Sequence, residues 1–339
     1  MSTRESLNIV FTGKEQLELR TEAVPELGPG QLLIESKATL ISTGTECICY
    51  QRNFEPGTHW HGWVKYPFYP GYSNAGTVLA VGEGVTDFVA GDRVATRSNH
   101  RQYVVANATG ALKIPDGVSD EDATWFGLAK IVQNGVRRAE HVMGDVVVVV
   151  GLGLLGQLVT QYTRLMGARE VIAVDLSGAR LEMAMAHGAT HMIQAGAGDA
   201  VETVREITDG HMADVVYDVT GFPAVFAQAL KHTRRFGRFV LLGDTGVPSG
   251  QSLTADIITK GLRIVGAHDS NPPAESTDHN YWSSDKIAEL FYTYVERGQM
   301  NVSNLVTHRY SPRDAAETYN MLVTDRSAVM GVIFDWTQL

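Results

Sequence analysis

Val-Val-Val-Val-Val-Gly-Leu-Gly-Leu-Leu-Gly, residues 146–156, joins a run of five valines to three closely spaced glycines. The valines are β-branched and offer no polar face, which predicts a short strand buried on both sides of a parallel sheet. Gly151 permits a tight turn after this strand, Gly153 lets the backbone approach a pyrophosphate, and Gly156 lets the following helix pack closely. The pattern therefore predicts a dinucleotide-binding turn.

The residues after the glycines agree with this interpretation. The stretch that begins at Leu154 predicts a helix whose first N–H groups, at Leu154 and Leu155, face the bound anion. The next predicted strand, 170–175, ends in Asp175, nineteen residues after Gly156. A carboxylate at this spacing can accept a hydrogen bond from a ribose 2′-hydroxyl.

The acidic side chain at position 175 also indicates which dinucleotide binds. Asp175 would repel the 2′-phosphate of NADP, so the sequence favours NAD as the cofactor. Arg180 leaves the alternative open, because a nearby Arg can receive that phosphate. We expect NAD rather than NADP.

The composition is that of an ordinary globular protein. Hydrophobic residues make up 44% and charged residues 19% of the 339 residues, a length that suggests two domains. The net charge of −10 and the lack of a basic run argue against a nucleic-acid partner. Residues 1–20 contain no apolar signal core, and no apolar run reaches the length of a membrane span. We therefore expect a cytoplasmic protein.

The cysteines give no sign of a metal site. Cys47 and Cys49 are the only two, and their spacing matches neither a C-x-x-C pair nor a four-thiolate zinc site. We expect two reduced thiols in a mostly buried segment.

Two kinds of pattern divide the chain. Residues 1 to about 120 contain short alternating runs and Gly-containing turns, which predict a compact β-barrel. Later strands alternate with helices, which predicts a parallel doubly wound sheet with a ligand crevice at the carboxyl ends of its strands. These strands are predicted at 146–150, 170–175, 191–194, 214–219, 237–242 and 262–267. The last would lie at a sheet edge, which favours a dimer through this edge.

This plan resembles the medium-chain dehydrogenase/reductase superfamily over nearly the whole chain. Gly-Tyr-Ser-Asn-Ala-Gly-Thr-Val-Leu-Ala-Val-Gly at 71–82 and Gly-Asp-Arg-Val at 91–94 resemble its signature, and the glycines at 151–156 with Asp175 match its coenzyme motif. The resemblance implies an α/β fold, with a GroES-like β-barrel catalytic domain and a Rossmann doubly wound parallel sheet. We expect the catalytic domain at 1–122, completed by 298–339, and the NAD-binding domain at 123–297.

Three positions depart from the zinc-dependent members of this superfamily. The C-x-[ST]-D segment of the family is Thr-Gly-Thr-Glu at 43–46 here, the G-H-E triplet is Gly-Tyr-Ser at 71–73, and the third ligand position aligns with Gly127. Thr, Tyr and Gly lack the thiolate, imidazole or carboxylate that zinc needs. The four-cysteine lobe of the family is replaced by Thr96–Arg101. We therefore expect a zinc-independent member.

Without zinc, other groups must handle the substrate proton and stabilise the alkoxide. The resemblance places Thr45 at the proton-relay position of the family, unless it only caps a turn. Tyr72 could act as acid, base or hydrogen-bond donor, with its pKa lowered by a cation. Lys130 could be that cation or the proton acceptor, unless it is a solvated helix lysine. Thr43 and Glu46 are expected substrate-binding residues, Glu46 by pairing with a cation in the pocket.

Residues 54–69 form a segment dense in aromatic side chains. Such a loop could cover the crevice and set specificity, or could pack on its own barrel. His59 or His61 could be the acid/base, because the unperturbed pKa of His is closest to neutrality. We take His61 as a catalytic candidate, and His59 and Trp63 as substrate-binding candidates.

Further candidates follow the ends of the later strands. Thr220 follows the fourth strand, and Leu242, Gly243 and Asp244 end the fifth, where they should border the ribose and the nicotinamide. His268 follows the sixth strand and could reach the substrate or serve a dimer contact.

These features predict a zinc-independent, NAD-dependent oxidoreductase that interconverts a secondary alcohol (a polyol, sugar or cyclic alcohol) and its ketone by hydride transfer. One alternative is an NAD(P)H-dependent quinone or enoyl reductase, because zinc-free members of this superfamily often reduce activated double bonds. Another is a non-catalytic dinucleotide-binding protein. The expected partners are a small-molecule substrate and further copies of the chain, in a homodimer or homotetramer, with no nucleic acid and no membrane.

Overall fold

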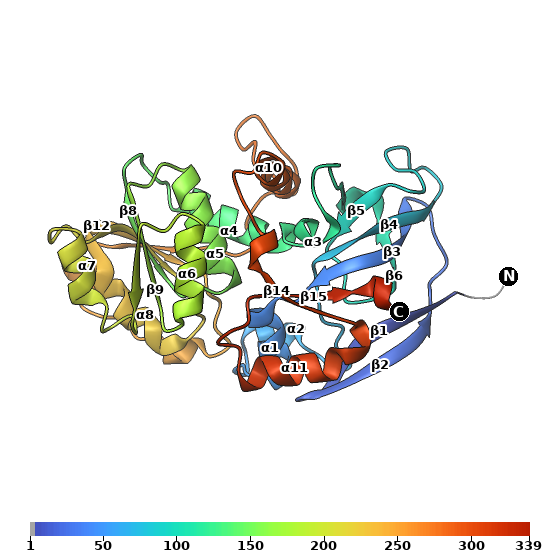
Figure 1. The fold of residues 1–339 in the computed structure, drawn as a ribbon, viewed down its shortest axis with the longest axis horizontal. Helices are drawn as coiled ribbons and strands as arrows, with labels where there is room; N and C mark the ends of the chain where they lie inside the picture. Colours follow the sequence, from blue (N-terminus) through green and yellow to red (C-terminus); the bar gives the residue numbers. More distant parts are fainter. Residues whose placement is uncertain (1–3) are drawn as a thin grey trace. The chain divides into compact units, whose positions relative to one another are not determined.

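The computed structural model describes residues 4–339, which fall into two compact units (Figure 1). Unit 1 contains the residues up to Leu128 together with Ala288–Leu339, and unit 2 is Ala129–Ile287. The two divisions fall inside helices α4 (Phe126–Arg138) and α10 (Ser284–Glu296), whereas the sequence-based boundaries are 122/123 and 297/298. A continuous helix carries no change of periodicity at such a division. Residues 1–3, part of the stretch in which no signal core is expected, lie outside the described residues.

Unit 2 is built on a six-stranded parallel sheet of order β10-β9-β8-β11-β12-β13. This confirms the predicted doubly wound sheet, and the strand order reverses between the neighbouring strands β8 and β11. The strands are β8 (Val146–Val150), β9 (Glu170–Asp175), β10 (His191–Gln194), β11 (Ala213–Asp218), β12 (Thr233–Leu241) and β13 (Arg263–Gly266).

The helices of unit 2 cover both faces of this sheet. They are α5 (Leu154–Leu165), α6 (Gly178–Ala186), α7 (Val201–Ile207), α8 (Pro223–Ala229) and the short α9 (Asp256–Thr259). Figure 1 shows α5 and α6 on one side of the strands and α7 and α8 on the other. Because both faces are covered, every valine of β8 is at most 3% exposed.

Unit 1 contains a hairpin and a larger sheet. The hairpin is β1 (Glu5–Gly13) with β2 (Gln16–Ala23), and the sheet has the order β14-β15-β3-β4-β5-β7, with β6 paired to β3. Its strands are β3 (Gln31–Leu40), β4 (Asn74–Val81), β5 (Arg93–Thr96), β6 (Tyr103–Asn107), β7 (Ala111–Lys113), β14 (Val306–Tyr310) and β15 (Gly331–Asp335). Within residues 4–339 the ladders do not close a ring, so the expected barrel is open in its strand pairing.

Helices α1 (Thr43–Gln51), α2 (His59–Trp63), α3 (Asp120–Ala123) and α11 (Ala315–Thr324) complete unit 1. Its aromatic core places Phe11 against Tyr50 and Tyr319, with ring centroids 5.0 and 4.9 Å apart. Cys47 and Cys49 of α1 belong to this core, which confirms that both thiols are buried. Burial raises the pKa of the Cys47 thiol to about 11.

Within residues 4–339, no helix is both long and apolar enough to span a bilayer.

Candidate active site and coenzyme site

The three glycines after β8 serve different structural roles. Gly151 has φ +93°, a conformation that disfavours other residues, and a Cβ there would lie 2.8 Å from the Thr220 methyl carbon. A Cβ on Gly156 would lie 2.0 Å from the Gly151 carbonyl oxygen, so only glycine lets α5 start here. A Cβ on Gly153 would have no atom within 4 Å. Gly151 and Gly156 are therefore needed by the fold, whereas Gly153 borders open space.

The residues around this turn fit a dinucleotide. Gly153 is the N-cap of α5 and provides no side-chain cap, so the amide groups at Leu154 and Leu155 are available to a pyrophosphate. One oxygen of Asp175 accepts the Leu152 N–H at 2.7 Å and the other accepts the Ser177 N–H at 2.8 Å. A carboxylate oxygen has two lone pairs, so each can still accept a ribose hydroxyl.

Arg180, the expected alternative partner of a 2′-phosphate, lies in the first turn of α6. Its backbone N–H donates to the N-cap Ser177 hydroxyl at 3.4 Å, and its carbonyl accepts the Gln157 amide at 2.8 Å. These contacts fix the start of α6 against α5. They concern the backbone of Arg180 and do not involve its guanidinium group.

Asp218 organises the turns after β11 and β12, although no sequence signal singled it out. This buried carboxylate accepts the Thr220 N–H at 3.1 Å and the Thr220 hydroxyl at 2.8 Å, and burial raises its pKa. The Asp218 carbonyl accepts the N–H groups of Leu242 and Gly243 at 3.1 and 2.9 Å. A Cβ on Gly243 would lie 2.6 Å from the Gly221 nitrogen. The expected coenzyme residues Thr220, Leu242 and Gly243 are thus held together.

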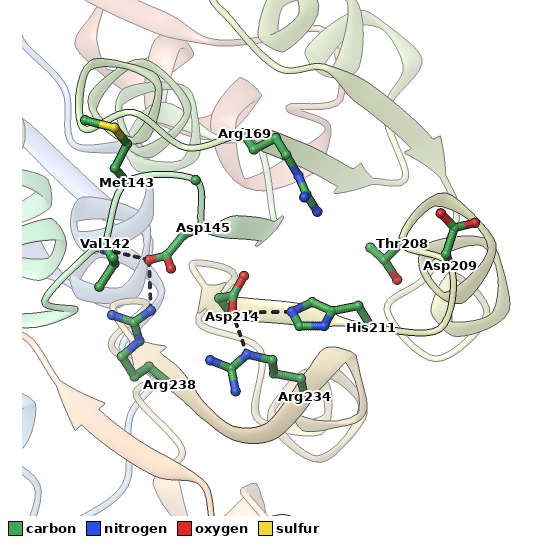
Figure 2. Close-up of a pocket in the computed structure, with 11 residues that line it drawn as sticks. Val142, Met143, Asp145, Arg169, Thr208, Asp209, His211, Asp214, Arg234 and Arg238 are labelled. Atoms are coloured by element: carbon green, nitrogen blue, oxygen red, sulfur yellow. Dashed lines mark hydrogen bonds and ion pairs between the residues drawn. The ribbon is translucent and has the colours of Figure 1, made fainter.

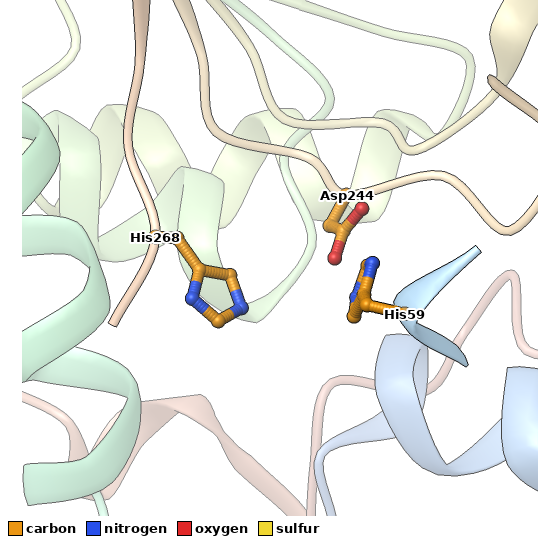
Figure 3. Close-up of side chains that lie close together, drawn as sticks. All are labelled: His59, Asp244 and His268. Atoms are coloured by element: carbon orange, nitrogen blue, oxygen red, sulfur yellow. The ribbon is translucent and has the colours of Figure 1, made fainter. Parts of the chain in front are cut away.

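Asp244 and His268 follow β12 and β13 in unit 2, and both are exposed (Figure 3). A carboxylate oxygen and a ring nitrogen of the pair lie within 4.8 Å of each other. Nδ1 of His268 is 2.8 Å from the Ser270 hydroxyl, and the His268 carbonyl accepts the Asn134 amide at 2.8 Å. The loop after β13 is therefore tied to α4. His59, also drawn in Figure 3, belongs to unit 1.

A separate pocket of about 640 Å³ lies at the amino ends of the unit 2 strands (Figure 2). Asp145 precedes β8 there, and its carboxylate accepts the Val142 N–H at 3.0 Å and the Arg238 guanidinium at 2.8 Å. Asp214 likewise accepts the Val146 N–H at 2.8 Å and pairs with Arg234. These acids are held by donors of their own unit. The dinucleotide turn follows the carboxyl end of β8, at the other edge of the sheet.

Three hydroxyl groups of unit 1 meet at the start of α1. The Tyr72 hydroxyl donates to Ser42 Oγ at 2.6 Å and also has a hydrogen bond to the Thr45 side chain. Ser42 is the N-cap of α1, yet its side chain makes no capping bond and serves Tyr72 instead. The structure thus brings together two predicted residues, Thr45 and Tyr72, and adds Ser42, which sequence reasoning missed.

The electrostatic environment of Tyr72 differs from the one expected. Burial raises the pKa of Tyr72 to about 12, and the Ser42 and Thr45 hydrogen bonds offset this only in part. The expectation of a phenol whose pKa is lowered by a cation was therefore wrong. The reason is that loss of solvent outweighs the Arg97 charge, although its guanidinium carbon lies 4.9 Å from the ring centroid.

The positions that hold zinc in related enzymes do not fit a metal ion. They are occupied by Thr43, Tyr72 and Gly127, none of which offers a thiolate, imidazole or carboxylate. A Cβ on Gly127 would lie 2.6 Å from Ser73 Oγ and 3.5 Å from the Tyr72 ring. Neighbouring side chains thus fill the space into which a ligand at position 127 would project.

Glu46, an expected substrate-binding residue, lies instead in a buried hydrogen-bond network of unit 1. It is 2% exposed, and its carboxylate accepts the Ser42 N–H at 2.8 Å and the Tyr319 hydroxyl. His100 Nε2 lies 3.0 Å from the same carboxylate. The expected pairing with a pocket cation is replaced by this internal network. The residue types at positions 46 and 319 gave no sign of it, because the partners are far apart in the sequence.

Thr43 begins α1 and is half-buried. Its carbonyl accepts the Arg326 guanidinium at 2.9 Å, which ties the start of the helix to the loop after α11. This contact uses the backbone of Thr43 and leaves the proposed role of its hydroxyl open to test.

The aromatic segment packs in part on its own unit. Trp60 is 3% exposed within the unit 1 core, whereas Trp63 is 50% exposed and meets the Phe68 ring edge-on at 5.2 Å. His61 Nδ1 accepts the Gly57 N–H at 3.3 Å, and the ring of exposed His59 lies 5.1 Å from that of Trp60. The contacts of His61 are thus made within its own loop.

Lys130 lies in α4 and is 6% exposed, so it is not a solvated helix lysine. Buried lysines are rare unless their charge is compensated. It belongs to unit 2, whereas Thr45 and Tyr72 belong to unit 1.

Comparisons with known proteins identify the family of this chain. Residues 28–121 match the alcohol dehydrogenase GroES-like domain, and residues 155–279 match the zinc-binding dehydrogenase family. The chain therefore belongs to the medium-chain dehydrogenase/reductase superfamily. The fold is the predicted one, a GroES-like domain with a Rossmann-type parallel sheet.

Two relatives and one solved structure illustrate what the chain is similar to. The chain is 28% identical to D-guloside 3-dehydrogenase of Escherichia coli (strain K12), over 76% of this chain and 75% of that protein. It is 27% identical to an L-threonine 3-dehydrogenase of Vibrio cholerae, over 92% and 94%. A dehydrogenase of Sinorhizobium meliloti 1021, solved with NADP bound, superposes with a TM-score of 0.81 at 20% identity over 98% and 99%.

Proposed function

We propose that this protein is a zinc-independent, NAD-dependent dehydrogenase that interconverts a secondary alcohol, in a polyol, sugar or cyclic compound, and its ketone. The observation that carries the proposal is the hydroxyl group cluster of Ser42, Thr45 and Tyr72, which stands where related enzymes hold a metal. Two relatives named as 3-dehydrogenases of a guloside and of L-threonine support an alcohol substrate.

The proposed cofactor follows from the coenzyme turn. Asp175 favours the free 2′-hydroxyl of NAD over the phosphate of NADP, and Gly153 leaves room for the pyrophosphate. When bound, the nicotinamide accepts a hydride from the alcohol carbon or returns it to the ketone. The protein must therefore move one proton at the substrate oxygen.

The hydroxyl cluster is suited to that proton. With a pKa of about 12, Tyr72 is protonated at neutral pH and can donate to the oxygen of a ketone. In the oxidation direction the reverse step applies: the Tyr72 phenolate takes the alcohol proton, directly or through the Thr45 hydroxyl, and Ser42 Oγ lies 2.6 Å from the phenol oxygen. The same donors stabilise the alkoxide that develops in the transition state.

The test is NAD reduction by enzyme kept in chelator, assayed on sugars, cyclitols and simple secondary alcohols. We expect turnover that survives the chelator and a loss of about 10²- to 10⁴-fold in kcat for Tyr72→Phe, the range for general acid–base catalysis. Stoichiometric zinc in protein purified without added metal, or activity lost with the chelator, would overturn the metal-free part.

Two further outcomes separate the alternatives. A Thr45→Ala, Tyr72→Phe double variant with full turnover on quinones or enones would favour a reductase of activated double bonds. Tight NADH binding without turnover on any compound would favour a non-catalytic role.

The matched control for these variants is Cys49→Ser. Cys49 lies on the core side of α1, the helix that carries Thr45, so this variant tests for effects on the packing of α1.

A further inference from the structure

The segment 97–101 forms hydrogen bonds to the backbone that precedes Tyr72. The Asn99 amide nitrogen donates to the carbonyl oxygens of Tyr69 at 2.8 Å and Gly71 at 3.0 Å. The Asn99 side chain therefore spans both ends of the Tyr69–Gly71 segment, which leads directly to Tyr72. Two bonds from one planar amide fix both the position and the orientation of this backbone.

His100 adds a second set of contacts to the same backbone. Its N–H donates to the Pro70 carbonyl at 2.9 Å, and its fully buried ring occupies the place where a Cβ on Gly71 would lie, 2.7 Å from the ring carbon. The ring nitrogens are held at 2.7 Å by the Thr39 hydroxyl and at 3.0 Å by the Glu46 carboxylate. Glu46 in turn accepts the N–H at the start of α1. His100 thus joins the backbone before Tyr72 to the helix that carries Thr45.

Arg97 supplies a charge to this arrangement. Its guanidinium carbon lies 4.9 Å from the centroid of the Tyr72 ring. The two charged side chains that act on the phenol are Arg97, which favours the phenolate, and Glu46, which opposes it. A cation at this distance stabilises negative charge on the ring more than it stabilises the neutral ring. It therefore acts most strongly when Tyr72 has given up its proton.

We propose that Arg97, Asn99 and His100 position Tyr72 for catalysis, with Asn99 and His100 fixing its backbone and the Arg97 guanidinium supplying the positive charge. This rests on the proposed function, in which Tyr72 transfers the substrate proton. The segment stands in place of the metal-binding lobe of related enzymes, and it brings the exposed guanidinium of Arg97 to a site whose own residues do not fit zinc. Arg97, Asn99 and His100 act through Tyr72 and are positioning residues.

The first test compares Arg97→Met, which removes the charge and keeps the length, with Arg97→Lys, which keeps the charge. We expect Arg97→Met to lower kcat at least tenfold with little change in the KM for NAD, and Arg97→Lys to recover most of the loss. Added guanidinium should partly restore Arg97→Met. Arg235→Met is the matched control, because Arg235 lies 5.3 Å over the exposed Phe236 ring in unit 2. Wild-type kcat in Arg97→Met would overturn the proposal.

The second test needs no substrate. The ultraviolet difference spectrum between the protein and its Tyr72→Phe variant isolates the titration of this one phenol among twelve tyrosines. We expect Arg97→Met to raise the midpoint, because the guanidinium favours the phenolate. An unchanged midpoint would overturn the role of Arg97.

The two tests separate the two proposals. If Tyr72→Phe leaves turnover unchanged while the midpoint shifts in Arg97→Met, the proposed function of Tyr72 fails and the pairing with Arg97 stands. If Tyr72→Phe abolishes turnover and Arg97→Met changes neither turnover nor midpoint, the proposed function stands and the positioning role fails.

Discussion

At the scale of single residues, the site depends on which side chains are missing as much as on which are present. Gly127 matters because its absent side chain leaves room for Ser73 and the ring of Tyr72. Ser42 matters because its hydroxyl forgoes the usual capping bond and accepts from Tyr72. The residue types at positions 43, 72 and 127 could be read from the sequence, and they were sufficient to argue against zinc. Their contacts could not be read, because they join segments that are far apart in the chain.

Tyr72 should make stability depend on pH in the alkaline range. Its pKa is raised from about 10 when unfolded to about 12 in the native state, so between these values the unfolded chain has lost the proton and the native protein has kept it. The free energy of unfolding therefore falls as pH rises through this window. Urea unfolding from pH 9 to 12 should show a steeper fall for the wild type than for Tyr72→Phe. Parallel curves would contradict the raised pKa of Tyr72.

Asp175 should decide between the two dinucleotides. Asp175→Asn removes the charge that repels a 2′-phosphate and weakens the bond to the ribose of NAD. Because a hydrogen bond to a charged group contributes about 1.5–3 kcal/mol, we expect roughly 10- to 100-fold weaker NAD binding and a smaller preference over NADP. Calorimetric titration with both dinucleotides measures this. Arg180→Met is the companion variant, and a larger effect there on NADP binding would assign the preference to Arg180.

At the scale of elements, the turn from β8 to α5 shows how one motif serves two purposes. Gly156 is required because a Cβ there would lie 2.0 Å from the carbonyl oxygen of Gly151, so the helix could not start against the strand. Gly153 has no such neighbour within 4 Å. The pattern of glycines was enough to predict strand, turn and helix. The pattern also assigned Gly153 to the ligand and Gly156 to helix packing, and the tertiary structure adds the distances that a Cβ would have at each position.

Alanine substitutions at Gly153 and Gly156 should therefore affect different properties, dinucleotide binding and stability. Gly153→Ala should leave thermal stability nearly unchanged and weaken dinucleotide binding, because its methyl group enters the space the pyrophosphate needs. Gly156→Ala should destabilise unit 2 by several kcal/mol, since its methyl group meets backbone that cannot yield. Calorimetric melting and NADH fluorescence titration measure the two effects. Equal melting temperatures for both variants would contradict this division of roles.

At the scale of the whole molecule, the sheet of unit 2 leaves two edge strands, β10 and β13. The short β13 presents Ile264, which is 39% exposed. Unpaired edge groups favour pairing with a second strand, and a dimer through β13 would satisfy them. The order of the strands agrees with the expectation that 262–267 lies at an edge, and the partner across it is still a prediction.

Charge on this edge should prevent assembly if the prediction is right. We expect sedimentation of the wild type as a dimer or tetramer and of Ile264→Lys as a smaller species, because a buried lysine at the interface would be unpaired. Met192→Lys at the opposite edge strand β10, where Met192 is 54% exposed, is the matched control. A monomeric wild type, or equal effects of both variants, would exclude a dimer through β13.

The sequence alone determined the features that depend on local pattern and residue type. These are the strand–glycine–helix turn at 146–156, the parallel sheet implied by the alternation of strands and helices, the acidic end of β9, and the Thr, Tyr and Gly at positions 43, 72 and 127. The tertiary structure decided everything that depends on long-range contact. It placed Glu46 in a buried network instead of the substrate site, raised the pKa of Tyr72 through burial, and brought Arg97 over its ring. The periodicity of apolar residues indicates which face of a helix or strand is buried. It does not indicate which distant segment packs against that face, because this contact forms only when the chain folds.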